Sequence, residues 1–239
     1  MRDFSSWLHE KENVELFLAL QKGSRLHQAL EPLKAPGMLF RKSTGKVALS
    51  RAWSLADFIR INEIDVVHVH WKFDLPVVAL ARKLSGKKFL FVHTRQMNMP
   101  GKKTDPYHRF VYGQLDAFIA ITRYIENQAH VNLPIHSDKI FQIYYGFSIS
   151  SAISHDRIKE LKSRFGITGK FTVGLLGRIS EYKGQHLLIE AVEQLNREGL
   201  PVHAFIVGAP FEPVYCRQLH QMVLDKALQE QVRFIDFYE

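Results

Sequence analysis

Two cations stand close together between an apolar segment and an amphipathic segment. Arg178 and Lys183, each beside a glycine, belong to the stretch Gly-Arg-Ile-Ser-Glu-Tyr-Lys-Gly-Gln. The apolar run 171–176 before them is typical of a buried strand, and the segment 185–197 after them of a helix. A strand-to-helix loop lies at the carboxyl end of the sheet, and a helix start adds N–H groups and partial positive charge. We therefore expect Gly177, Arg178 and Lys183 to bind a phosphate or diphosphate.

His93 is the candidate for a reacting or positioning side chain outside that loop. It closes the apolar run 88–93, so a predicted strand ends at its imidazole. A structural histidine would fit the same position, and of the two we favour the active-site role.

His68 and His70 are two residues apart on another predicted strand and therefore share one face of it. A metal ion would need further ligands that converge on the pair, and the sequence offers none. We favour a structural role for both, and we expect no metal.

Lys102 and Lys103 follow a glycine in the long loop 94–105. They could contact an anionic acceptor or a membrane surface, or they could simply be solvated. We keep the acceptor-side role as a hypothesis beside the solvated loop.

The composition limits the class of protein. The 239 residues carry a net charge of +8 and are 46% hydrophobic, which fits a globular protein with acidic partners such as nucleotides or anionic lipids, or simply a soluble surface. The single cysteine excludes an internal disulfide and suits a reducing compartment. The start does not resemble a signal peptide, and no apolar run approaches the roughly 20 residues of a membrane span. We expect a cytoplasmic protein, with the inner face of the membrane as an alternative site.

Apolar runs of strand length alternate with helical patterns along the whole chain. Runs such as Val-Val-His-Val-His lack the alternation of a half-exposed strand, which indicates strands covered on both faces. The pattern predicts an α/β fold with parallel sheets. We expect strands at 14–20, 65–70, 88–93, 117–121, 139–143, 171–176, 202–207 and 232–237, and helices at 24–33, 55–62, 75–84, 107–114, 123–131, 155–165, 185–197 and 213–228.

A change of composition divides the chain. Residues 148–154 are rich in serine, and a charged segment and a glycine-containing turn follow. We predict a first α/β domain at 1–150, a hinge at 151–170 and the first part of a second domain at 171–239. Because three strands make a thin core, we expect that this second domain is incomplete and that the chain is truncated.

The second half resembles the retaining GT-B glycosyltransferases of family 4, the "glycosyl transferases group 1" type. The matching stretches are 173–179, 182–185, 188–191, 195, 205–208, 215, 219 and 232–234. The first half is similar more loosely, at Asp-Val-Val-His-Val-His, Val-His-Thr and Asp-Ala-Phe-Ile-Ala-Ile-Thr.

The resemblance implies two Rossmann-like domains, of which the first binds mainly the acceptor and the second binds a nucleotide-diphosphate sugar. Arg178 and Lys183 match the basic pair on the donor diphosphate, and His93 matches a histidine near the transferred sugar. The family implies transfer with retention and without a metal or cofactor, to a sugar, lipid-linked or other hydroxyl acceptor. Its acidic donor-binding pair is expected beyond Glu239. Its first strand is expected to be missing from this chain, and the glycine-rich loop that follows that strand in the family is absent from the sequence.

Three other functions compete with the transferase. A non-catalytic fragment or accessory subunit that binds a nucleotide fits the lack of the acidic pair. A dinucleotide oxidoreductase is disfavoured, because no Gly-x-Gly-x-x-Gly follows a strand. Nucleic-acid binding rests on net charge alone, and we expect no nucleic-acid partner.

Overall fold

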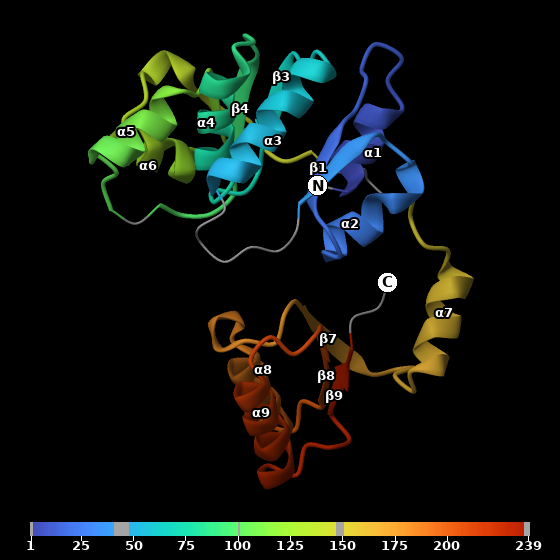
Figure 1. Cartoon of the computed structure of the whole chain (residues 1–239). Helices are drawn as coiled ribbons and strands as arrows, with labels where there is room; N and C mark the ends of the chain where they lie inside the picture. The colour runs from blue at the N-terminus through green and yellow to red at the C-terminus, as the bar shows by residue number, and fades with distance from the viewer. Residues whose placement is uncertain (1, 41–47, 100, 147–150, 237–239) are drawn as a thin grey trace. The chain divides into compact units, whose positions relative to one another are not determined.

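The chain forms two compact units, Met1–Phe147 and Ser148–Glu239. The computed structural model describes residues 2–40, 48–99, 101–146 and 151–236 (Figure 1). Both units are α/β, and every strand pair within them is parallel, as the sequence predicts. The predicted hinge lies in the second unit, where residues 155–164 form a helix.

The main sheet of the first unit has the order β3-β4-β5-β6. Its strands are interleaved with helices that cover them, so Phe91 and Phe118 at adjacent strands have no exposed surface. Hydrophobic burial around these rings is the main stabilising contribution to this core. The elements are α3 (Ala48–Ile61), β3 (Val66–Val69), α4 (Leu75–Ser85), β4 (Leu90–Arg95), α5 (Pro106–Gly113), β5 (Ala117–Ala120), α6 (Arg123–Asn132), η2 (Ser137–Lys139) and β6 (Ile140–Gln142).

A second, two-stranded sheet belongs to the same unit. It pairs β1 (Leu18–Gln21) with β2 (Gly37–Phe40). The sequence analysis was wrong in placing no strand at β2, which follows Pro36, has only four residues and is half exposed. Gly37 is required there, because a Cβ atom would lie 2.3 Å from the Leu18 carbonyl oxygen. The remaining elements are α1 (Arg2–His9), α2 (Arg25–Leu30) and η1 (Glu31–Leu33).

Side-chain caps fix where several helices begin. The hydroxyl or carboxylate of the residue before the helix accepts a hydrogen bond from the backbone N–H three positions on, which satisfies one of the free donors of the first turn. The caps of this kind are Ser24, Asp105, Thr122 and Ser154.

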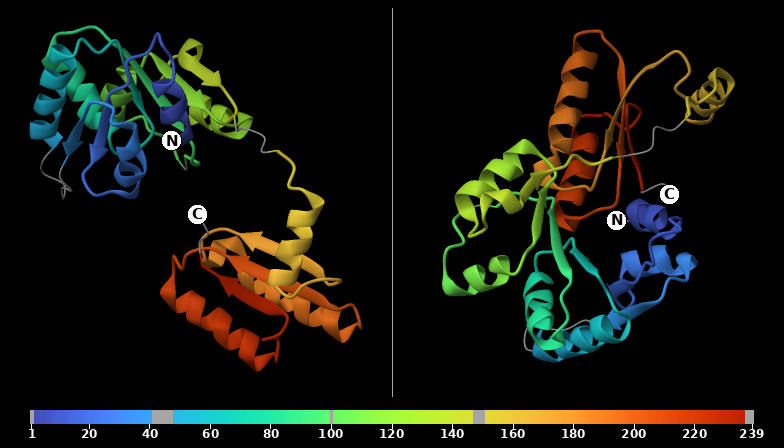
Figure 2. Two further views of the ribbon diagram at one scale, coloured as in Figure 1. Left: turned by 90° about the vertical axis from the view of Figure 1, so that its right-hand side faces the viewer. Right: turned by 90° about the horizontal axis from the view of Figure 1, so that it is seen from above.

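The second unit is a sheet of order β7-β8-β9 with helices on both faces. Figure 2 shows α8 and α9 on one face and α7 on the other. On the α7 side, the rings of Phe165 and Phe205 meet edge to face, and Arg233 donates to the Phe165 carbonyl oxygen. The elements are α7 (His155–Arg164), β7 (Phe171–Leu176), η3 (Glu181–Lys183), α8 (Gln185–Arg197), β8 (Val202–Val207), α9 (Pro213–Asp225) and β9 (Val232–Ile235).

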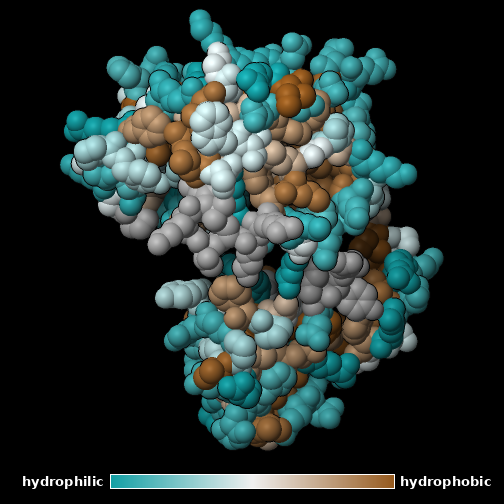
Figure 3. All heavy atoms as spheres, viewed as in Figure 1, coloured by the Kyte–Doolittle hydropathy of each residue, from teal (hydrophilic) through white to brown (hydrophobic). Residues whose placement is uncertain are grey.

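The surface carries hydrophobic side chains in small groups. On the face drawn in Figure 3 these groups lie among hydrophilic ones. Within the described residues, no helix combines the length and the apolar character that crossing a bilayer requires.

Candidate functional site

The loop after β7 is held against the loop after β8. Gly177 N–H donates to the Val207 carbonyl oxygen over 2.9 Å, and Ile179 N–H donates to the Ala209 carbonyl oxygen over 3.0 Å. The two backbones approach so closely that a Cβ atom on Gly208, whose φ is +153°, would lie 2.0 Å from the Gly177 carbonyl oxygen. The loop that carries the predicted phosphate-binding residues is therefore fixed by its backbone.

Arg178 extends from this fixed backbone toward solvent. Its carbonyl oxygen accepts a hydrogen bond of 3.0 Å from the Gln185 side-chain amide, and Gln185 is fully buried. Its guanidinium carbon lies 4.4 Å from the ring centre of Phe211. The backbone and the side chain of Arg178 thus each have a defined partner.

Lys183 lies at the end of η3 and is exposed. Gly184 follows it with a φ of +71°, a left-handed conformation that suits glycine, and α8 begins at the next residue. Among the residues that the structure describes, neither Lys183 nor Arg178 pairs with a carboxylate. Both cations of the predicted site therefore remain available to an anion.

The start of α8 offers fewer free N–H groups than the sequence suggested. His186 N–H donates to the Tyr215 hydroxyl over 3.2 Å, and that hydroxyl also lies 2.7 Å from His186 Nδ1. The nearby Glu181 N–H donates to the Glu212 carboxylate over 3.3 Å. In a solvent-accessible anion site, the charged side chains must therefore contribute more of the binding than the helix start.

His93 lies within β4 and is 1% exposed. Its Nδ1 atom is 2.9 Å from the Val69 carbonyl oxygen, an acceptor, so Nδ1 carries the proton and Nε2 the lone pair. Burial lowers the pKa of His93 to about 4, although the bond to Val69 acts in the opposite direction. The ring is therefore neutral at pH 7, and its buried Nε2 has no partner among the described residues.

The other two histidines of the sequence analysis lie beside each other at the end of β3. The ring centres of His68 and His70 are 4.1 Å apart, and Phe4 of α1 packs on both. His68 Nε2 is 2.8 Å from the Thr94 hydroxyl, and burial lowers the pKa of His70 to about 3. No cluster of three or more metal-ligating side chains occurs among the described residues.

Lys102 and Lys103 lie in the loop before α5. Lys103 N–H donates to the Asn132 carbonyl oxygen over 2.8 Å, which anchors the loop to α6. The Lys102 side chain is exposed. Their acceptor-side role stays a prediction.

Family models match both units. The model of Glycosyltransferase Family 4 matches residues 2–151, more than half of the chain. The chain belongs to glycosyltransferase family 4. A second model, Glycosyl transferases group 1, matches residues 157–239, which include the loop of Arg178 and Lys183.

Several solved structures share the fold of this family member. Anabaena Alr3699/HepE in complex with UDP and glucose is 24% identical over 93% of this chain and 62% of that chain, with a TM-score of 0.74. A glycosyltransferase from Rickettsia africae ESF-5 is 18% identical over 92% and 59%, with a TM-score of 0.78. The chain thus spans about three fifths of the length of these proteins. No curated protein matches it.

Three residues around the candidate site residues escaped the sequence analysis. Phe211 and Gln185 each contact Arg178. The sequence signal that indicates Phe211 is the pattern Gly-Ala-Pro-Phe, which forms a second strand-to-helix loop after β8. The third is Arg95, which is only 9% exposed. Its guanidinium donates to the Met97 and Asn98 carbonyl oxygens and so shapes the loop after β4.

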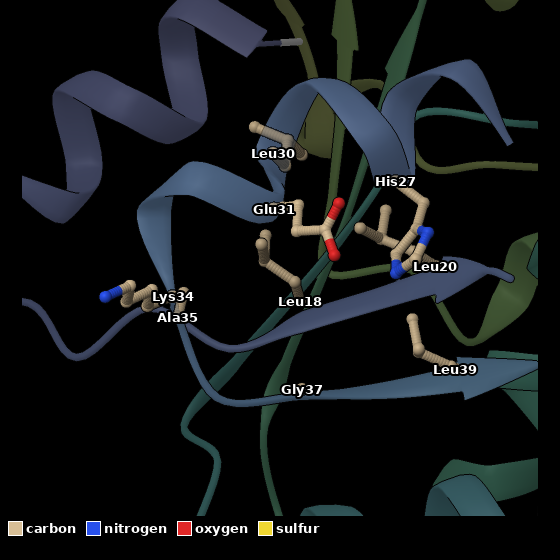
Figure 4. A pocket seen from close by; sticks show the side chains of 9 residues that line it. All are labelled: Leu18, Leu20, His27, Leu30, Glu31, Lys34, Ala35, Gly37 and Leu39. Carbon is tan, nitrogen blue, oxygen red and sulfur yellow. The ribbon is translucent and has the colours of Figure 1, made fainter. Parts of the chain in front are cut away.

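A separate hollow of about 210 Å³ lies between α2 and the two-stranded sheet. Figure 4 shows leucine side chains around it, together with Glu31 and His27. Its lining includes no residue of the Arg178 loop and neither His93 nor the two lysines. It is lined by Leu18, Leu20, His27, Leu30, Glu31, Lys34, Ala35, Gly37 and Leu39.

Proposed function

We propose that this protein transfers a glycosyl group from a nucleotide-diphosphate sugar to a hydroxyl acceptor with retention of anomeric configuration. The observation that carries the proposal is the pair of exposed cations, Arg178 and Lys183, on a fixed loop at the end of β7 and the start of α8. Membership of glycosyltransferase family 4 supports the reaction class.

The cations act on the leaving group. Cleavage of the sugar–phosphate bond builds negative charge on the departing diphosphate, and cations that are already in place stabilise this charge more in the transition state than in the ground state. Arg178 supplies parallel N–H donors to phosphate oxygens, and Lys183 supplies a compact charge. This pair performs the role that a metal ion has in other transferases, so we propose that no metal is required.

The first unit binds the acceptor in this proposal. The neutral His93 cannot act as an acid at pH 7, since its pKa is lowered to about 4. Its unprotonated Nε2 instead accepts a hydrogen bond from a hydroxyl of the transferred sugar, which requires the groups that bury this atom to move aside when the donor binds. Lys102 and Lys103 contact an anionic acceptor, either a phosphorylated sugar or a lipid-linked one at the cytoplasmic face of a membrane.

A non-catalytic, nucleotide-binding role is the second candidate. It needs only the exposed cations Arg178 and Lys183, which can bind a diphosphate whether or not a transfer step follows. In this case the Arg178 loop would hold a nucleoside diphosphate without turnover.

Calorimetry with UDP, the nucleotide bound in the Anabaena structure, tests the shared premise. We expect the 239-residue chain to bind UDP, and Arg178→Ala combined with Lys183→Ala to weaken binding by at least about a hundredfold, since each charge-assisted hydrogen bond contributes about 1.5–3 kcal/mol. Arg178→Lys should bind UDP more tightly than Arg178→Ala but less tightly than the unmodified chain, because lysine keeps the charge and loses the parallel N–H donors. The control Arg217→Ala removes an exposed cation of α9 and should bind as the unmodified chain does.

Turnover separates the two candidates. Release of UDP and glucose from UDP-glucose, abolished by Arg178→Ala, supports the transferase, whereas UDP binding without turnover supports the accessory role. Unchanged UDP binding by the double variant would overturn both.

A further inference from the structure

We propose that Phe211 is a positioning residue that orients the Arg178 guanidinium for the diphosphate of the donor. The inference rests on the proposed diphosphate-binding role of Arg178 and extends it to a second loop. Phe211 touches neither the sugar nor the reacting atoms in this proposal, and it acts only through Arg178.

The contact itself is a cation–π interaction. The Arg178 guanidinium carbon lies 4.4 Å from the ring centre of Phe211, within the range where the negative face of an aromatic ring attracts a cation. The Phe211 side chain is 59% exposed, so the ring is not buried in the core of the second unit. Burial in the core therefore does not account for the position of this ring, and its contact with Arg178 is the interaction that does.

The ring is held by the backbone on which Arg178 is built. Phe211 N–H donates to the Ile179 carbonyl oxygen over 3.1 Å, and Glu212 N–H donates to the same oxygen over 3.2 Å. Ile179 is the residue directly after Arg178, and it is 3% exposed. The Phe211 backbone is therefore fixed relative to the arginine, and any motion of one loop moves the other.

An aromatic partner suits an arginine that must bind an anion. A carboxylate would neutralise the guanidinium and occupy its N–H donors, whereas a phenyl ring has no acceptor oxygen and leaves the charge in place. The neighbouring carboxylate of Glu212 accepts a hydrogen bond from Glu181 N–H, not from Arg178. Phe211 thus restricts the long arginine side chain without neutralising the charge that binds phosphate.

A double-mutant cycle on UDP affinity tests the inference with the whole chain. We expect Phe211→Leu to weaken UDP binding by about threefold to tenfold, and Phe211→Trp to stay within about twofold of the unmodified chain, because a larger ring retains the cation–π interaction. In the Arg178→Ala background, Phe211→Leu should have no further effect on affinity. The control Phe171→Leu makes the same change at a ring that is 69% exposed at the start of β7, and it should leave affinity unchanged.

The contact can also be measured without a ligand. The Arg178 Nε–H resonance should be displaced by the ring current of Phe211 in the free chain, and this displacement should disappear in Phe211→Leu. If Phe211 only stabilised the fold, Phe211→Leu would lower UDP affinity by the same factor in the unmodified chain and in Arg178→Ala, and Phe211→Trp would not preserve the affinity.

The outcomes separate this inference from the proposed function. Full UDP affinity in Arg178→Ala, or no binding by the unmodified chain, would overturn the proposed function and this inference with it. Lost affinity in Arg178→Ala with unchanged affinity in Phe211→Leu would overturn only the positioning role of Phe211. Equal losses from Phe211→Leu in both backgrounds would also overturn it.

Discussion

His93 and Arg178 are candidate site residues of two different units, and the fold treats them in opposite ways. His93 lies inside a parallel strand, two residues before the end of β4, whereas Arg178 lies in a loop, two residues beyond the end of β7. His93 is buried, neutral and hydrogen-bonded to the adjacent strand, whereas Arg178 is exposed and its charge has no carboxylate partner among the described residues.

The difference shows how each unit can present a functional group. The first unit keeps its imidazole in the uncharged form through desolvation, which suits a hydrogen-bond acceptor. The second unit fixes the backbone of a loop and leaves the cations in solvent, which suits the capture of an anion. The comparison predicts that the site in the first unit is sensitive to pH and the site in the second unit to backbone geometry.

The largest effect should come from Gly208→Ala. The added Cβ atom would lie 2.0 Å from the Gly177 carbonyl oxygen, at a φ of +153° that suits only glycine. We expect a loss of more than about 3 kcal/mol in the free energy of unfolding of the second unit, measured by urea denaturation. Gly174→Ala in β7 is the matched control, because its Cβ atom would meet only the Leu176 side chain at 3.5 Å. Equal stability of the two variants would show that the loops can separate freely.

Acid should destabilise the first unit through His93. Its pKa is about 4 in the fold and 6.5 in an unfolded chain, so the unfolded state binds more protons between these values. The free energy of unfolding of the first unit should therefore be highest above pH 6.5, and it should fall by up to about 3 kcal/mol as the pH drops to 4. His93→Phe should cost about 1 kcal/mol at pH 7.5 through the lost bond to Val69, and it should make the stability less dependent on pH.

Urea denaturation of both chains at pH 7.5 and pH 5 checks this prediction. His68 and His70, whose pKa values are also lowered by burial, should leave a residual pH dependence in His93→Phe. His130→Ala, a change at an exposed histidine of α6, should retain the full dependence. If the free energy of unfolding of His93→Phe fell between pH 7.5 and pH 5 as much as that of the unmodified chain, other groups would cause the acid sensitivity.

Gln185→Leu should have an intermediate effect on the second unit. It removes the amide that donates to the Arg178 carbonyl oxygen while retaining a similar volume at a fully buried position. We expect a loss of about 1–2 kcal/mol of stability, together with weaker UDP binding. Gln194→Leu, at an exposed position of the same helix, should change neither quantity. Full UDP affinity in Gln185→Leu would mean that the Arg178 backbone needs no such support.

The sequence predicted the two strands that carry the Arg178 site better than it predicted the contacts around that site. The apolar runs 171–176 and 202–207 coincide with β7 and β8, because a short apolar run of this length is typical of a strand. The expected burial holds for β8, in which every second residue is buried, and is wrong for β7, in which no residue is buried. The contacts of Gln185 and Phe211 with Arg178 depend on where two loops meet, and no local pattern contains that information. The strand β2 was missed for a similar reason, since its four residues gain their place from pairing with β1.

The smallest effect should come from Tyr215→Phe, and it tests whether the helix start or the side chains bind the anion. The Tyr215 hydroxyl accepts a hydrogen bond from His186 N–H and shares a second hydrogen bond of 2.7 Å with His186 Nδ1. Its removal should cost about 1 kcal/mol of stability and release an N–H group at the start of α8. If the cations dominate, UDP affinity should not fall, and a released donor can only increase it. The control Tyr182→Phe changes a tyrosine that is 97% exposed, and it should alter neither stability nor UDP affinity. If Tyr215→Phe alone lowered UDP affinity, the hydrogen-bonded start of α8 would be needed to position the site.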